Sequence, residues 1–357
     1  MPGWNARELA GMEGPARRGA AAALVAATCF GAAAPVSKEL LRHSGIAALS
    51  FLLYLGAFVA LSLVSAMRGP SREARFSRGD IPGLAAVAVA GGVVGPLLLL
   101  FGLHRTTGMA GSLLLNLEAP LTVLLAVAFF GEHLSARLLV AAGAVFAGAG
   151  FLATDPGRSY ATAAGALAIS GACLAWAIDN NITQRLSLRD PIRLVQVKTG
   201  VAAAGLGVIS VATDSRFPPL RFAVVALAVG ALGYGLSIVL DVYALRLIGA
   251  AREAALFATA PFVGALLAIP LLSERLTAGI GVASALMISG VAAFVWERHE
   301  HLHVHAPIEH EHVHEHDEHH HHAHDRAPAA SHSHLHWHEP AEHAHPHASD
   351  AHHRHSH

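Results

Sequence analysis

The residues best suited to chemistry in this chain are acidic and amide side chains set inside long apolar runs. Glu118 lies in the middle of one run and is followed two residues later by Pro120. An ionisable side chain at bilayer depth costs roughly 2.5–3.5 kcal/mol on insertion scales, so each one is a functional candidate. A proline removes a helix hydrogen bond and can open space beside the glutamate. We expect Glu118 to face a cavity and to bind a cationic group or a proton. The alternative is a neutral Glu118 that is hydrogen-bonded to a neighbouring helix.

A second polar cluster comprises Trp176, Asp179, Asn180 and Asn181. Three consecutive polar side chains cover about 300° of a helix, so they cannot all face lipid without a large cost. We expect this patch to line the substrate pathway, with Trp176 as an aromatic wall one turn earlier. The alternative is that the helix ends near Ile178 and that the three polar residues form a hydrated cap.

Asp241 lies late in another apolar run, close to Tyr243 and Arg246. A salt bridge at the helix end explains Asp241 better than ligand binding does, although it remains a candidate substrate-binding residue. Arg252 and Glu253 begin the next run, where a charge pair at a helix terminus is expected.

Other charged residues at the ends of the runs have structural explanations. Lys38 and Arg105 can extend their charged groups to the membrane interface without any ligand. Glu132 and Glu274 are each followed three residues later by a serine or threonine, which favours a role in a turn or helix cap over substrate contact.

The C-terminal segment is rich in histidine and almost free of apolar residues. Of the 59 residues from His299 onward, 24 are His and ten are Asp or Glu. Imidazole suits Zn, Ni, Co and Cu, and a flexible chain can bring several rings around one ion. An unstructured, solvated extension without function is the alternative. The candidate metal ligands are His299, His301, His303, His305, His310, His312, His314, His316, His319, His320, His321, His322, His332, His334, His336 and His338.

Long apolar runs must position these groups. The chain is 54% hydrophobic and 14% charged, with a mean hydropathy of +0.47, and its runs of roughly 18–23 residues match the ~30 Å of bilayer hydrocarbon. The runs are apolar all round, which indicates an all-α membrane protein rather than a soluble core. We predict ten transmembrane helices at 18–37, 46–67, 81–103, 108–130, 135–153, 161–182, 194–212, 219–242, 249–272 and 276–296.

The chain contains an internal duplication. Ala119-Pro120 precedes Glu132 at nearly the same distance as Ala260-Pro261 precedes Glu274. Five crossings in each half make the second copy enter the membrane from the opposite side, which predicts two inverted repeats, residues 18–153 and 161–296, and a disordered tail at 299–357. Inverted repeats are typical of transporters that bind substrate near the bilayer midplane.

Lys and Arg residues predict the orientation. With the N-terminus inside, fifteen of them, Lys198 included, fall in inner segments and seven in outer segments. An excess of positive charge marks the cytoplasmic side. We therefore expect a multi-pass protein of the inner (plasma) membrane with both termini in the cytoplasm.

The duplicated segments resemble a known family. The stretches from Leu103 through Glu118-Ala119-Pro120 to Glu132, and from Ala244 through Ala260-Pro261 to Glu274, are similar to the EamA-type repeat of the drug/metabolite transporter superfamily. Phe30 and Trp176 occupy the matching aromatic position of the two opening helices. The resemblance covers residues 18–296 and implies ten helices around a central cavity, without naming a substrate. The histidine-rich extension is not part of that pattern.

These observations predict a secondary transporter, and specifically an exporter, of a small metabolite or drug-like solute, with a metal-binding tail. The alternatives are an exporter of Ni, Co or Zn, and a membrane-anchored metal reservoir or sensor without transport. No Walker-type phosphate loop occurs in the sequence, and no catalytic constellation is recognisable, so we do not expect an enzyme. No cofactor is expected to be required. The expected partners are a small-molecule substrate, transition-metal ions and the lipid bilayer, with no nucleic acid, and the protein is a monomer or a homodimer.

Overall fold

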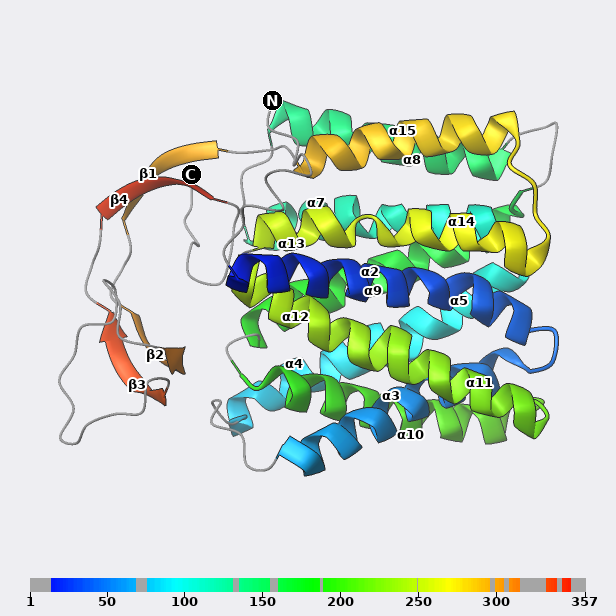
Figure 1. Ribbon diagram of the computed structural model, residues 1–357, viewed down its shortest axis with the longest axis horizontal. Helices are drawn as coiled ribbons and strands as arrows, with labels where there is room; N and C mark the ends of the chain where they lie inside the picture. Colours follow the sequence, from blue (N-terminus) through cyan, green and yellow to red (C-terminus); the bar gives the residue numbers. More distant parts are fainter. Residues whose placement is uncertain are drawn as a thin grey trace.

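The computed structural model describes residues 14–68, 76–130, 135–154, 160–186, 189–248, 250–295, 299–304, 308–314, 332–338 and 342–347. Within these ranges nine helical segments are long and apolar enough to cross a membrane, and a tenth, shorter apolar helix follows them. The segments lie side by side. The first residues of α2 and the last residues of α15 are found at the same end of the bundle (Figure 1). Nearly all of the predicted spans are recovered, and their ends shift by a few residues.

The first half contains the first five spans. Its elements are α2 (Gly14–Leu40), α3 (Ile46–Arg68), η1 (Arg78–Asp80), α4 (Ile81–Val87), η2 (Ala88–Val94), α5 (Gly95–His104), α6 (Gly108–Leu114), η3 (Leu115–Leu117), α7 (Glu118–Phe130) and α8 (Ala136–Thr154). The second half consists of α9 (Ala163–Leu186), α10 (Pro191–Ala212), α11 (Leu220–Gly230), η4 (Ala231–Leu236), α12 (Ser237–Ile248), α13 (Ala250–Phe257), α14 (Ala260–Leu272) and α15 (Ala278–Val295).

The two halves are interrupted at matching places. The third and eighth spans each contain a π-helical segment, η2 and η4. The fourth span is broken at η3, and the ninth is broken between α13 and α14. A proline cannot donate to the carbonyl four residues earlier and its ring crowds that carbonyl. Pro120 therefore disrupts the helix at Asn116, and Pro261 disrupts it at Phe257.

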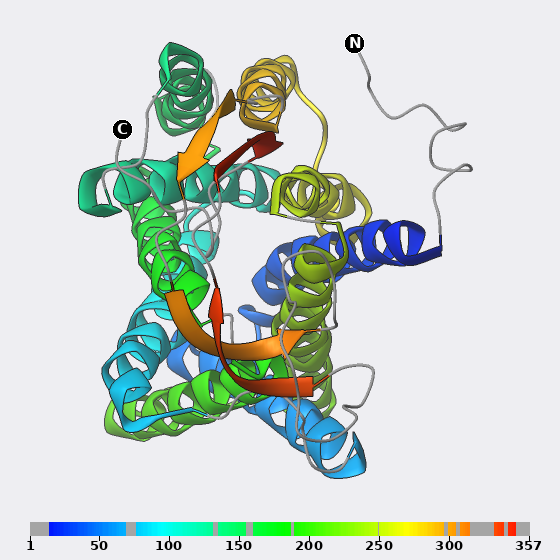
Figure 2. The ribbon, with the colours of Figure 1, turned by 90° about the vertical axis from the view of Figure 1, so that its left-hand side faces the viewer.

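Matching helices of the two halves also pack against each other in opposite directions. At one edge of the bundle α3 lies beside α10, and at the other edge α8 lies beside α15 (Figures 1 and 2). The backbone N–H of Gly45, before α3, donates to the carbonyl of Arg216, after α10. Tyr160, which follows α8, contacts Thr277, which precedes α15. Each pair is therefore antiparallel.

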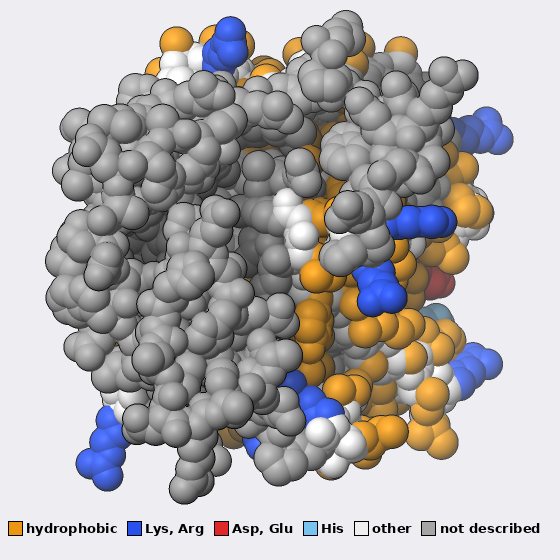
Figure 3. Space-filling model, turned by 60° about the vertical axis from the view of Figure 1, so that its left-hand side comes forward, with side chains coloured by type: hydrophobic (Ala, Val, Ile, Leu, Met, Phe, Trp, Pro, Cys, Tyr) orange, Lys and Arg blue, Asp and Glu red, His pale blue; other side chains and the backbone are white. Residues whose placement is uncertain are grey.

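Large apolar side chains remain exposed around the helices, as expected for a surface that faces lipid. Phe129 is 75% exposed and Val140 is 73% exposed. On the described part of the face in Figure 3, hydrophobic side chains predominate and Lys and Arg side chains stand singly among them.

The described residues of the tail form the strands β1 (His299–Val304), β2 (Ile308–His314), β3 (His332–His338) and β4 (Glu342–His347), and the disorder expected for 299–357 stays a prediction. β1 pairs with β4 and β2 pairs with β3, both antiparallel. Histidine at alternate positions matches the two-residue period of a strand. The strands lie at the end of the bundle where α15 finishes (Figures 1 and 2).

Candidate functional site

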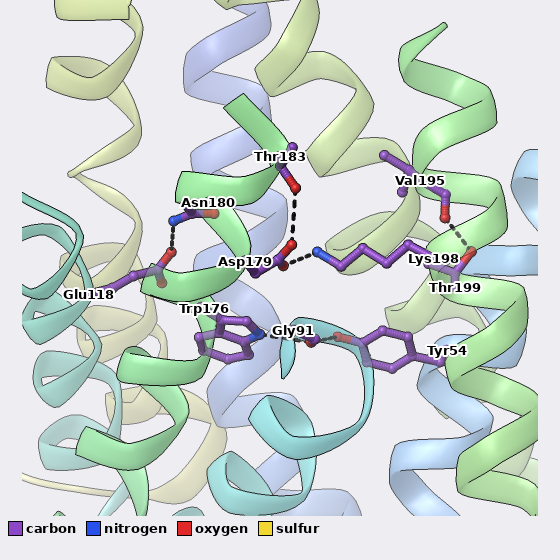
Figure 4. A network of polar contacts seen from close by, with 10 residues as sticks. All are labelled: Tyr54, Gly91, Glu118, Trp176, Asp179, Asn180, Thr183, Val195, Lys198 and Thr199. Atoms are coloured by element: carbon purple, nitrogen blue, oxygen red, sulfur yellow. Dashed lines mark hydrogen bonds and ion pairs between the residues drawn. The ribbon is translucent and has the colours of Figure 1, made fainter. Parts of the chain in front are cut away.

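A layer of polar side chains connects α3, α7, α9 and α10, and α9 contributes more of them than any other helix (Figure 4). The helix runs to Leu186, so Asp179, Asn180 and Asn181 lie inside it. The alternative of a hydrated cap beginning near Ile178 is therefore wrong. Each of the three polar side chains instead contacts a different residue of a neighbouring helix.

Asp179 forms an ion pair with Lys198 of α10. Thr183, one turn later on α9, donates to the second carboxylate oxygen at 3.0 Å. Asp179 is only 2% exposed, and the Lys198 side chain is 11% exposed. Both charges are thus compensated inside the protein, and Asp179 is less open to a ligand than the sequence suggested.

Asn180 points to the other side of α9 and donates a hydrogen bond to the carboxylate of Glu118 at 2.8 Å (Figure 4). Glu118 begins α7, directly after the break in the fourth span, and is half-buried, whereas Asn180 is exposed. Asn181 is 6% exposed and donates to the backbone carbonyls of Thr122 and Ala177. Glu118 and Asn180 are therefore the accessible members of the cluster, while Asn181 joins α9 to α7.

Trp176 is anchored by the third span. Its indole N–H donates to the carbonyl of Gly91 at 3.0 Å, and the hydroxyl of Tyr54 donates to the same oxygen at 2.8 Å. Gly91 lies in η2, where a Cβ atom would come within 1.9 Å of an Asp179 carboxylate oxygen. At Gly95, a Cβ atom would come within 2.6 Å of the Trp176 indole nitrogen. These glycines allow α9 to approach the third span closely enough for both contacts.

An aromatic cluster surrounds Trp176. Phe30 of α2 makes an edge contact with Trp176 at 6.1 Å between ring centroids. Phe30 also contacts Tyr234 at 6.1 Å and Phe257 at 5.5 Å. Aromatic rings in such arrangements add to the packing energy and offer faces to a cation. The two residues expected to match between the halves, Phe30 and Trp176, thus touch each other.

Asp241 lies near a second acidic side chain. Its carboxyl group lies near enough to that of Glu253 on α13 for the two to interact electrostatically. Glu253 is 8% exposed, and its expected charge pair with Arg252 stays a prediction. The side chains of Arg246 and Arg252 lie outside the described part of the structure. Asp241 and Glu118 are near enough to interact electrostatically.

Two charged residues near the ends of the spans have structural partners. Glu274 accepts hydrogen bonds from the backbone N–H groups of Gly108 and Met109 at 2.5 and 2.8 Å, so it caps the first residues of α6 in the other half. Lys38 donates to the carbonyls of Leu103 and Thr106 at 2.7 and 2.5 Å rather than only extending to the interface.

Other predicted residues lie where less can be described. Glu132 and the candidate ligands His305, His316, His319, His320, His321 and His322 lie outside the described residues. The remaining candidate histidines lie on β1, β2 and β3, with their side chains outside the description. Among described residues, no group of three or more His, Cys, Asp and Glu side chains could hold a metal ion.

Sequence reasoning missed Lys198, Tyr54 and Glu253 as members of the polar layer. Lys198 was counted as an inner-segment charge, although it lies inside a predicted span, where a lysine needs a partner. Without Lys198 the inner segments still hold more Lys and Arg residues than the outer segments, so the predicted orientation does not change. Glu253 likewise lies inside the predicted span 249–272, whereas Tyr54 carried no such signal, because its hydrogen-bond partner Gly91 lies on a different span.

The charges of this layer are unbalanced. Among described side chains, Lys198 compensates Asp179, and Glu118, Asp241 and Glu253 remain as acidic groups. An ion in a low-dielectric interior needs a counter-charge or a proton. The arrangement can therefore attract a cation or hold protons.

Comparisons with known proteins place these features in a family. The model of the EamA-like transporter family matches residues 17–154 and 163–296, one match for each half. An uncharacterized transporter of Methanothermobacter thermautotrophicus is 31% identical over 232 residues, which cover 63% of this chain and 67% of that protein. A protein of known crystal structure has the same fold with a TM-score of 0.58 at 17% identity, over 79% of this chain and 98% of that one. With its long apolar helices, the chain is thus a multi-pass membrane transporter of small solutes that belongs to the EamA-like transporter family.

Proposed function

We propose that the protein is a secondary transporter that carries a small aromatic organic cation through a site between two inverted halves. The observation that carries this proposal is the Glu118–Asn180 pair. It presents an accessible carboxylate at the break of the fourth span, within an excess of acidic groups. A carboxylate beside an aromatic wall is suited to a cationic group, because the ring face and the carboxylate both attract positive charge.

Alternating access around this site is supported by the arrangement of the helices. The antiparallel pairs α3–α10 and α8–α15, and the matching interruptions of the third and eighth and of the fourth and ninth spans, are what inverted repeats would produce. Broken helices at mid-depth are typical of transporter binding sites, because they offer unpaired backbone groups inside a protein cavity.

A second role is proposed for the tail, which binds transition metal independently of the transported solute. The composition of 24 histidines in 59 residues supports this proposal. Metal as the transported species is the rival interpretation.

The first test is a thermal-shift series on purified full-length protein with three probes of similar size: benzyltrimethylammonium, benzyl alcohol and benzenesulfonate. We expect only the cation to raise the melting temperature. Glu118→Gln should weaken its binding at least about tenfold, or about 1.4 kcal/mol. The control is Glu39→Gln, which changes an exposed carboxylate paired with Arg42 and should bind the cation normally.

The proposal is wrong if benzenesulfonate stabilises the protein instead, or if Glu118→Gln binds the cation as the wild type does. A shift with Zn²⁺, Ni²⁺ or Co²⁺ that persists after removal of residues 299–357 would favour metal as the transported species.

A further inference from the structure

A small cavity at one end of the bundle is lined by basic side chains. Its volume is about 210 Å³, and the described residues that line it are Lys38, Leu41, Arg42 and His104, none of them acidic. The cavity is smaller than the roughly 300–1,000 Å³ of a pocket for a drug-sized ligand. It has room for several water molecules, whose share of liquid volume is about 30 Å³ each, and hence for a small oxyanion.

Lys38 is held in place beside this cavity. It lies in the last turn of α2, and its ammonium group donates to the backbone carbonyls of Leu103 and Thr106. An ammonium group has three N–H donors, so these two bonds leave one for a ligand. Because the two carbonyls fix the charge before any ligand binds, binding costs less ordering of the side chain.

Arg42 supplies a second positive charge with donors to spare. Its side chain is 67% exposed, and both of its contacts with Glu39, at 3.2 and 3.4 Å, use the single nitrogen Nη1. A guanidinium group has five N–H donors in a planar fork that matches the oxygens of a phosphate group. An exposed ion pair of this kind is weak, so a phosphate group can displace Glu39 from Arg42.

The other groups near Lys38 leave the basic character of the cavity intact. His104, the last residue of α5, is exposed and adds an imidazole N–H donor. Glu274 is close enough to Lys38 to interact electrostatically, but its two carboxylate oxygens accept from the backbone N–H groups of Gly108 and Met109. Neither Glu39 nor Glu274 lines the cavity.

The cavity lies where a helix bundle meets lipid headgroups. Lys38 is in the last turn of the span Ala16–Leu40, and His104 is the last residue of the span Arg78–His104. This end of α2 is the end of the bundle away from the tail strands (Figure 1). The ends of transmembrane spans reach the polar headgroup region, and basic pockets between transmembrane helices bind lipid headgroups.

We propose that Lys38, Arg42 and His104 form a binding site for a phosphate group, which is carried by an anionic lipid or is free in solution. The phosphate oxygens accept hydrogen bonds from the remaining ammonium N–H of Lys38, the guanidinium group of Arg42 and the imidazole of His104, and Glu39 is displaced. A bound phosphate group joins the end of α2 to the end of α5. The site shares no residue with the Glu118–Asn180 pair and does not depend on the proposed transport function.

The first experiment is native mass spectrometry of the full-length protein in detergent, titrated with dioleoylphosphatidylglycerol. Dioleoylglycerol, which has the same acyl chains and no phosphate, is the comparison lipid and should bind more weakly. Arg42→Gln changes a largely exposed side chain and should fold. We expect it to bind phosphatidylglycerol at least about tenfold more weakly than the wild type, because it loses a charge-assisted hydrogen bond.

Two matched variants test whether placement matters more than charge alone. Glu39→Gln removes the competing carboxylate, so it should bind phosphatidylglycerol at least as tightly as the wild type. Arg216 is exposed at the same end of the bundle, where its backbone carbonyl accepts from the N–H of Gly45, and it does not line the cavity. Arg216→Gln should therefore change binding by less than about twofold, because exposed charges outside the site are screened.

The second experiment replaces the lipid with inorganic phosphate and measures the melting temperature. A loss in Arg42→Gln of lipid binding alone identifies the lipid headgroup as the ligand, and a loss of stabilisation by phosphate alone identifies free phosphate. The proposal is overturned if Arg42→Gln responds to both probes as the wild type does, or if Arg216→Gln loses as much binding as Arg42→Gln. Weaker binding in Glu39→Gln than in the wild type also overturns it.

Discussion

At the scale of single residues, the partner of Asp179 decides what that residue can do. An acid in an apolar span is expensive, and the sequence makes it a candidate ligand group. Lys198 satisfies it inside the protein, so the pair joins α9 to α10. Glu118 has the opposite situation, because its described side-chain partner is a neutral amide and its carboxylate remains accessible.

The Asp179–Lys198 pair leads to a stability prediction. Lys198→Met leaves Asp179 as a buried, uncompensated charge, which should destabilise the protein by about 3–5 kcal/mol. Adding Asp179→Asn removes that charge and should recover much of the loss. The measurement is the melting temperature of the purified variants, combined in a double-mutant cycle.

Arg42→Met supplies the matched control, because it breaks the exposed pair with Glu39. It should change stability by less than about 1 kcal/mol. Equal losses from Lys198→Met and Arg42→Met would argue against an important buried pair.

At the scale of elements, the interruptions of the helices position the site. η2 presents the Gly91 carbonyl to Trp176 and Tyr54, and the break before Pro120 places Glu118 at the start of α7. π-Helical segments and broken helices are frequent at functional sites, because their backbone groups are free to bind side chains or ligands. The prolines are visible in the sequence, but the π-helical segments carry no comparably clear sequence signal.

Close packing of α11, in the second half, against α3, in the first half, depends on Gly230. A Cβ atom there would come within 1.9 Å of the Leu53 carbonyl oxygen on α3. Gly230→Ala should therefore lower the melting temperature, although alanine is usually better than glycine within a helix by about 1 kcal/mol. Gly143→Ala on α8 is the control, because its Cβ atom would meet nothing within 4 Å, and it should be neutral or stabilising.

If Gly230→Ala were as stable as Gly143→Ala, the close approach of α3 and α11 would not hold in the membrane. The sequence does not distinguish these glycines, because both lie within long apolar helices, and only the structure shows that Gly143 is open.

At the scale of the whole molecule, the membrane body and the histidine-rich tail are separate in composition and in their expected chemistry. Removal of residues 299–357 should abolish retention on a chelating resin loaded with Ni²⁺ or Zn²⁺, and should leave cation exchange by the body within about twofold of wild type. Acidification should release the metal, because imidazole must be neutral to ligate and its unperturbed pKa is about 6.5. Metal retention that is unchanged by truncation, or by a change from pH 7.5 to 5, would contradict the role of the tail.

The architecture was largely predictable, because it depends on local properties of the chain. A run of about 20 apolar residues must form a helix in the bilayer, since its backbone groups can be satisfied only internally. A proline interrupts that helix at the carbonyl four residues before it. The repeated Pro-to-Glu segment predicts two similar halves. The candidate region around Glu118 and Trp176 followed from polar residues at bilayer depth.

The partners of those residues could be decided only by the tertiary structure. Asn180 bonds to Glu118 across 62 positions of sequence, and Glu274 caps Gly108 across 166. Asp241 and Glu253, which lie on different helices, interact electrostatically, and the sequence does not indicate this neighbour. The sequence shows that a charged or amide side chain within an apolar run needs a partner, because burial without one is costly. Which partner it finds depends on how the helices pack, and that is a property of the whole bundle rather than of any single segment.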